Sequence, residues 1–161
     1  ATVQGYGYHG TSTVTRAANQ PPYTANDVVG GALTIATVGP TGGGEIFITN
    51  LNIMMNITAL PAAMTTFSLY LYNVTPPSAI ADNSPFTLGS GDRASYLRRI
   101  TGITAVLLGT GTSSVGCQLD NINLQCKTLN GSLFAYLVTD GAFTPAANSE
   151  TYSMVVKSVG V

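Results

Sequence analysis

Apolar side chains recur at every second position over most of this chain, and this period of two limits what it can fold into. In residues 47–57 the odd positions are mostly apolar, and the even positions include three asparagines. Residues 66–73 alternate in the same way, with phenylalanine and leucine on one side and serine and tyrosine on the other. Such alternation predicts half-buried β-strands. Further strands are expected at 32–38, 96–108 (interrupted by Gly102) and 152–159.

The dipeptide Asn130-Gly131 adds a second constraint, because it lies between two alternating runs. Asn-Gly favours a two-residue type I′ turn, in which both central residues have positive φ. The sequence therefore predicts a β-hairpin in which Cys126 faces Ala135 and Lys127 faces Phe134. One side of this hairpin is wholly apolar and is expected in the core: Ile122, Leu124, Cys126, Leu133, Ala135 and Leu137. The other side carries Gln125, Lys127, Phe134 and Tyr136.

The chain shows about seven or eight such strands, separated by loops rich in Gly, Pro, Asn and Ser, with no helical crossovers. This pattern predicts an all-β fold, a single-domain antiparallel β-sandwich with a jelly roll as the favoured topology. An extended N-terminal arm is expected over residues 1–20, followed by the sandwich domain at 21–161. No second domain or internal repeat is indicated.

The arm contains Gly5-Tyr6-Gly7-Tyr8-His9-Gly10, which matches the G-x-G-x-x-G spacing of dinucleotide-binding loops. That motif needs a buried strand before it and a helix after it. Only four residues precede Gly5, and the β-branched run after Gly10 is a poor helix start. We therefore interpret the stretch as a Gly/Tyr-rich arm that docks on a neighbouring molecule.

Charged residues make up only 8% of the chain, against about 25% in typical proteins. The surface must therefore consist of Thr, Ser, Asn, Gly and Tyr, which suits a chain packed against partners; a secreted β domain is the alternative. The net charge of −1 gives no general case for nucleic acid or an anionic membrane as a partner. No transmembrane run or signal peptide is recognised.

Catalytic and metal-binding signals are weak. The single histidine, His9, lies in the arm, and the two cysteines lack C-x-x-C spacing. Four aspartates each adjoin Gly or Asn and are interpreted as turn residues: Asp82, Asp92, Asp120 and Asp140. No catalytic residue, metal ligand or cofactor is predicted. Both cysteines are expected to be reduced, with Cys126 buried; a single disulfide between Cys117 and Cys126 would instead indicate an oxidising compartment.

One basic cluster, formed by Arg93, Arg98 and Arg99, stands out in a chain with six basic residues. Arginine is favoured in protein interfaces, and a basic stripe with a stacking platform for nucleic acid is missing. Tyrosine combines a large contact area with a polar tip, so it too is enriched at interfaces. The candidate protein-contact residues are Tyr6, Tyr8, His9, Tyr70, Tyr72, Arg93, Arg98 and Arg99.

Four blocks of the sequence resemble a family of tailed-bacteriophage virion proteins, the small jelly-roll cement (decoration) proteins of phage heads. The blocks are PPYTANDVVGG (21–31), EIFITNLNIMMN (45–56), FSLYLYNVTPPSAIADNSPFTL (67–88) and GDRASYLRRI (91–100). The resemblance covers roughly residues 20–100 and excludes the arm and the cysteines.

The resemblance implies a non-enzymatic structural protein on the outer surface of a phage head, assembled in the bacterial cytoplasm. Its expected partners are the major capsid protein, whose contacts it stabilises, and itself, as a homo-oligomer with a dimer favoured over a trimer. The rival hypothesis is a glycan-binding or adhesin-type β-sandwich, either a secreted protein or a phage fibre head. An enzyme is the weakest alternative.

Overall fold

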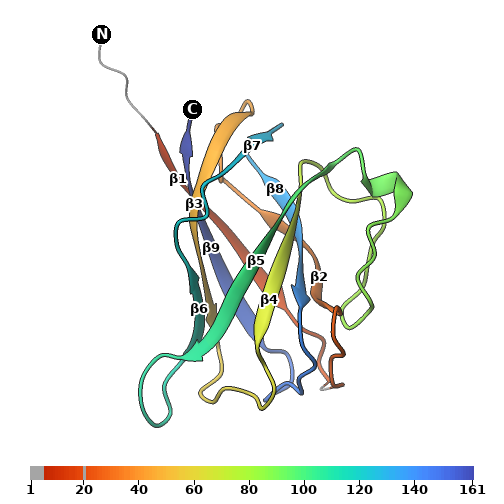
Figure 1. Cartoon of the computed structure of the whole chain (residues 1–161), viewed down its shortest axis with the longest axis vertical. Coiled ribbons are helices and arrows are strands. Elements are labelled where there is room, and N and C mark those ends of the chain that lie inside the picture. Colours follow the sequence, from red (N-terminus) through yellow and green to blue (C-terminus); the bar gives the residue numbers. More distant parts are fainter. Residues whose placement is uncertain (1–5, 20) are drawn as a thin grey trace.

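The computed structural model describes residues 6–19 and 21–161, and these form nine β-strands (Figure 1). A short 3₁₀ turn, η1 (Ser90–Asp92), is the sole helical element within the described residues. The strands are β1 (Gly7–Thr15), β2 (Val28–Ile35), β3 (Gly44–Met55), β4 (Thr66–Tyr72), β5 (Tyr96–Leu107), β6 (Val115–Leu119), β7 (Leu124–Thr128), β8 (Leu133–Thr139) and β9 (Thr151–Gly160). The all-β, antiparallel sandwich expected from the alternation is confirmed.

The strands pair in a nested order. β1 pairs with β9, β2 with β8, β3 with β6, and β4 with β5, all antiparallel. This nesting is the strand arrangement of a jelly roll, a long hairpin rolled into two facing sheets. One sheet has the order β1-β9-β3-β6 and the other β5-β4-β8-β2. They meet where β5 pairs with β6 and at the bridge from Thr11 to Ala36.

The predicted hairpin at Asn130-Gly131 is wrong. β7 pairs with β3, whereas β8 pairs with β2 and β4 in the facing sheet, so residues 129–132 cross from one sheet to the other. Gly131 has a φ of 83°, but Asn130 does not have the positive φ that a type I′ turn requires. The glycine is needed for packing as well, because a Cβ at Gly131 would lie 2.9 Å from the carbonyl oxygens of Gly39 and Pro40.

The faces predicted for these two strands are nonetheless mostly correct. Leu133, Ala135 and Leu137 are fully buried and Cys126 is 7% exposed, while Ile122 and Leu124 are partly buried against the core. Alternation fixes which side of a strand is buried, and it holds whichever strand is the partner. Tyr136 is an exception, since it lies on the outer side of β8 and is still fully buried.

Tyr136 is buried because the long loop 73–95 folds back over the outer side of β4 and β8 (green in Figure 1). Ile80 and Phe86 of this loop pack on Tyr136 and Val28 in a second apolar cluster. Asp82 ties the loop to the sheet, since its carboxylate accepts hydrogen bonds from Tyr23, Gly30 and Ala17. The loop is therefore an additional layer that covers the outer side of the β4–β8 sheet.

The predicted N-terminal arm is extended, but its described part is not separate from the domain. Residues 7–15 are β1 and pair with β9 along their whole length, from Gly7–Val159 to Thr15–Thr151. Val14 is fully buried in the core. The sandwich therefore begins at β1, before the boundary expected at residue 21. Residues 1–5 and 20 lie outside the described residues.

Candidate interaction surface

The candidate contact residues lie in separate regions of the molecule. Tyr6 and His9 are exposed and Tyr8 is half-buried at the start of β1. In the sheet, β9, β3 and β6 lie between β1 and β5, which carries Arg98 and Arg99. The tyrosines of the arm and the arginines therefore do not form one site.

Tyr72 is not a contact residue. It is fully buried between Tyr96 and Tyr136, with ring centroids 5.7 and 5.8 Å away. Burial raises the pKa of its hydroxyl well above the usual value, and that hydroxyl has no hydrogen-bond partner within the described part of the chain. The prediction fails because loop 73–95 covers the side of β4 that alternation assigned to solvent.

Tyr70 and Arg99 do come together. They are directly paired on β4 and β5, and the Arg99 Cζ lies 5.9 Å from the centroid of the Tyr70 ring. Phe86 supports the other side of Tyr70, with ring centroids 3.9 Å apart. A guanidinium above an aromatic face is held by a cation–π interaction. The hydrogen bond from Arg99 to the Tyr70 hydroxyl raises the pKa of Arg99. Like any arginine, this exposed residue carries a positive charge, and here the charge lies on an aromatic support.

A shallow groove of about 280 Å³ begins at Arg99 and runs between β5 and the connection from β6 to β7. Its lining combines charged or polar rim residues with an apolar floor: Arg99, Thr101, Asp120, Ile100, Ile122 and Leu124. A second hollow of about 350 Å³ is lined by Arg98, Phe47 and residues 122–125. Ile122 and Leu124 line both hollows, so the two adjoin.

The groove exists because the strand opposite β3 is interrupted. β6 and β7 run in the same direction along β3, one pairing with Leu51–Met55 and the other with Gly44–Ile48. Between them, Asn121 and Asn123 have φ values of 55° and 50°. Asparagine tolerates this left-handed conformation better than most residues. Sequence reasoning missed this interruption, although the pair of asparagines is a signal that could have suggested it.

The exposed arginines form no ion pair within the described residues. The one ion pair among residues 6–19 and 21–161 joins Arg16 to Glu150, so no carboxylate lies within 4 Å of the arginines at 93, 98 and 99. Arg93 is exposed just after η1, and the neighbouring Asp92 is buried and accepts hydrogen bonds from Ser78 instead. The positive charges are therefore available to a partner.

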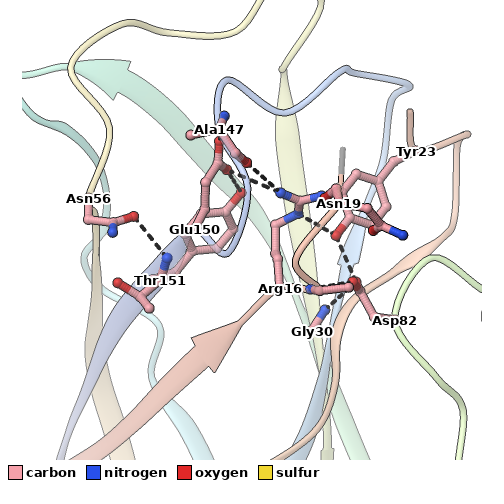
Figure 2. Close-up of polar contacts among 11 residues, drawn as sticks. Arg16, Asn19, Tyr23, Gly30, Asn56, Asp82, Ala147, Glu150 and Thr151 are labelled. Atoms are coloured by element: carbon pink, nitrogen blue, oxygen red, sulfur yellow. Dashed lines mark hydrogen bonds and ion pairs between the residues drawn. The ribbon is translucent and has the colours of Figure 1, made fainter. Parts of the chain in front are cut away.

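The densest group of ionisable residues is structural (Figure 2). Arg16 is buried and lies 3.8 Å from Glu150, and its Nε donates a hydrogen bond of 2.6 Å to the Tyr23 hydroxyl. Tyr23 donates in turn to Asp82, which holds loop 73–95. Arg16 also donates to two backbone carbonyl oxygens, of Ala147 and Asn19. The network therefore joins the end of β1, the start of β9 and loop 73–95 through contacts within the protein.

The cysteines are buried free thiols on neighbouring parts of the same sheet. Cys117 of β6 pairs with Ile53, and Cys126 of β7 pairs with Ile46. Seven positions along β3 separate these partners, about 23 Å at strand spacing. A disulfide requires Cα atoms within about 7 Å, so these two residues cannot form one in this fold.

Clusters of three or more metal-ligating side chains are absent from the residues that the structure describes. Within the same residues, no helix is long and apolar enough to cross a membrane. No protein-family model matches the chain, and no curated protein matches it significantly in sequence.

Proposed function

We propose that this chain is a structural virion protein that binds the outer surface of a bacteriophage head and stabilises contacts between major capsid proteins. The proposal rests on the four sequence blocks that resemble jelly-roll cement proteins. It is supported by one structural observation, an exposed apolar patch on a sheet face with few charges. The protein would be assembled in the bacterial cytoplasm, with both thiols reduced.

The patch lies on the outer side of β3, β6 and β5. Met54, Gly116 and Val106 are paired in one row across the three strands, and Met54 and Val106 are 50% and 44% exposed. Leu108, also 50% exposed, lies over Gly116, where a Cβ would be 2.8 Å from its Cδ1. Large apolar side chains that are exposed together on one face favour attachment to another protein. Repetition over a symmetric shell would multiply weak contacts into strong attachment.

Cosedimentation with purified phage heads tests this function. The wild-type protein should pellet with heads, and Met54→Lys/Val106→Lys should pellet far less, because two charges would be buried on binding. Leu129→Lys is the matched control, since Leu129 is 51% exposed outside the patch. Failure of the wild-type protein to bind any head preparation, or equal binding of the patch variant, counts against the proposal.

Self-association is part of the same proposal. A homodimer is favoured over a trimer, because two-fold symmetry is the commonest arrangement of soluble homo-oligomers. Analytical ultracentrifugation of the protein without heads would distinguish a monomer, a dimer and a trimer.

Glycan binding is the second candidate, and the polar hollow at Thr49, Asn121 and Asn123 favours it. Asparagine and threonine side chains can hydrogen-bond sugar hydroxyls. The disulfide that a secreted adhesin would carry is ruled out by the positions of Cys117 and Cys126. A glycan array with the wild-type protein separates the two functions, since specific glycan binding without head binding would favour the adhesin.

A further inference from the structure

Two strand edges face the same groove without a hydrogen-bonded neighbour. β7 pairs with β3 alone, and β5 pairs with β6 only through Ala105–Leu107. No backbone hydrogen bond in the described part of the chain joins residues 96–104 to residues 119–128. Figure 1 shows β5 beside β6 at the lower end of the view and running away from it toward the upper end. An unpaired strand edge is a template for another extended segment.

The groove offers apolar contacts beside these edges. Ile100 of β5 is buried at its floor, while Ile122 and Leu124 are only partly buried. These side chains pack against the main core and remain partly open to solvent. An added strand with apolar residues at alternate positions would cover them and pair with the free edge of β5.

The positive charge beside the groove favours an added strand that carries acidic side chains. Arg98 pairs with the core residue Leu71, so it lies on the inner side of β5, yet it is exposed and lines the hollow beside residues 122–125. Arg99 lies on the outer side beside Tyr70. Asp120 lines the groove, but neither arginine has a carboxylate within 4 Å. Arginine pairs well with carboxylates in bidentate geometry.

We propose that an extended, acidic segment of a partner protein adds as a strand to β5 in this groove. Its carboxylates pair with Arg98 and Arg99, and its apolar side chains cover Ile122 and Leu124. This inference deepens the proposed function, since the partner would be the shell protein, but the groove can be tested without heads. The competing explanation is that Arg98 is an inward-pointing charge that protects the edge from strand addition.

The probe is a short capped peptide in which valine alternates with threonine and glutamate, titrated into ¹⁵N-labelled protein. We expect saturable amide shifts at residues 97–103 and 124–125. A peptide with lysine in place of glutamate, or with a central proline, should bind at least about tenfold more weakly. Arg98→Glu/Arg99→Glu should reverse the preference between glutamate and lysine, and Arg93→Glu, which is outside the groove, should leave it unchanged.

Three results would overturn the inference: equal binding of the glutamate and lysine peptides, shifts confined to other strands, or binding to Arg98→Ala but not to the wild-type protein. The last result would assign Arg98 to edge protection. Cosedimentation separates this inference from the proposed function. If heads bind the wild type and Arg98→Glu/Arg99→Glu equally, the protein decorates heads but the groove is not the binding site. If the acidic peptide binds but heads do not, the groove is a binding site and the proposed decoration function is wrong.

Discussion

Arg16 holds three parts of the fold together through one guanidinium. Its partners are the carboxylate of Glu150 just before β9, a tyrosine hydroxyl, and two backbone carbonyl oxygens. Nothing in the sequence pattern distinguishes this arginine from the exposed arginines at 93, 98 and 99, because alternation reports apolar positions and cannot identify a buried charge. Its role depends on Glu150 and Tyr23, which are distant along the chain or in another element.

Replacing Arg16 with alanine should therefore be severe. Glu150 would be left buried without its partner, which typically costs about 3–5 kcal/mol of unfolding free energy. Urea unfolding followed by circular dichroism measures this loss. The control is Arg98→Ala, an exposed position, where the change should stay within about 0.5 kcal/mol. A loss at Arg16 as small as that at Arg98 would contradict the assignment of the network to stability.

Alanine substitutions on β7 and β8 should differ in how much unfolding free energy they remove. Leu137→Ala should lose about 2–5 kcal/mol, because Leu137 is fully buried. Leu124→Ala should lose less, since Leu124 is partly exposed at the groove, and Gln125→Ala should lose under about 0.5 kcal/mol. The measurement is again the free energy of unfolding. Equal losses at Leu137 and Gln125 would show that a partner or a second copy covers the outer side of β7.

At the scale of the strands, alternation predicts which side of a strand is buried, but it does not predict which strands pair with each other. It correctly assigns Cys126 and Leu137 to the core, but it cannot show that β7 and β8 belong to different sheets. Asn130-Gly131 wrongly suggests a hairpin because a glycine can serve either in a tight turn or in close packing against another backbone segment. Here Gly131 permits close packing on Gly39 and Pro40, whereas a type I′ turn would need positive φ at Asn130 as well.

The burial of β6 and β7 against the core predicts how the thiols titrate. Burial raises the pKa of Cys117 to about 12, and burial with the Glu45 carboxylate raises that of Cys126 to about 11. The native state then holds these protons more tightly than the unfolded chain, in which the thiols have a pKa of about 8.5. Their contribution to stability is complete below that pH and is lost as the pH rises through the folded pKa values.

Two measurements test this. Native protein at neutral pH should react slowly with a thiol reagent, and denatured protein should show both thiols. The unfolding free energy should fall above a pH of about 9. Cys117→Ser/Cys126→Ser should show a shallower fall, because the thiols no longer titrate and only the buried tyrosines still contribute. Rapid native labelling of either cysteine would contradict the burial that the fold assigns to it.

At the scale of the whole molecule, the sequence predicts the class of fold and part of the candidate surface. Arg99 and Tyr70 are neighbours because β4 and β5 pair, and both strands follow from alternation. Tyr72 is lost from the site because a loop without periodicity covers it. The groove arises where the strand beside β3 is interrupted between β6 and β7. Asn121 and Asn123 hint at that interruption, but the lining of the groove depends on pairings between distant strands, which alternation does not predict.

Removing residues 1–15 should unfold the protein. The deletion takes away β1, leaves β9 with one partner fewer and opens the core at Val14. Thermal unfolding should show a much lower midpoint or no cooperative transition, while Thr11→Ala, an exposed change within β1, should keep the midpoint of the full chain. A cooperative transition with an unchanged midpoint after the deletion would show that residues 7–15 are dispensable for the fold.

The pairing of β1 with β9 also decides when this protein can fold. Gly7 pairs with Val159, so apart from the bridge from Thr11 to Ala36 the first strand lacks its pairing strand until the ninth has been synthesised. Folds dominated by such distant pairings form slowly, in about milliseconds to seconds. During translation the apolar sides of the earlier strands therefore stay uncovered, and unpaired strands are prone to aggregate. High-level expression should favour inclusion bodies, and slower synthesis at low temperature should raise the yield of native protein.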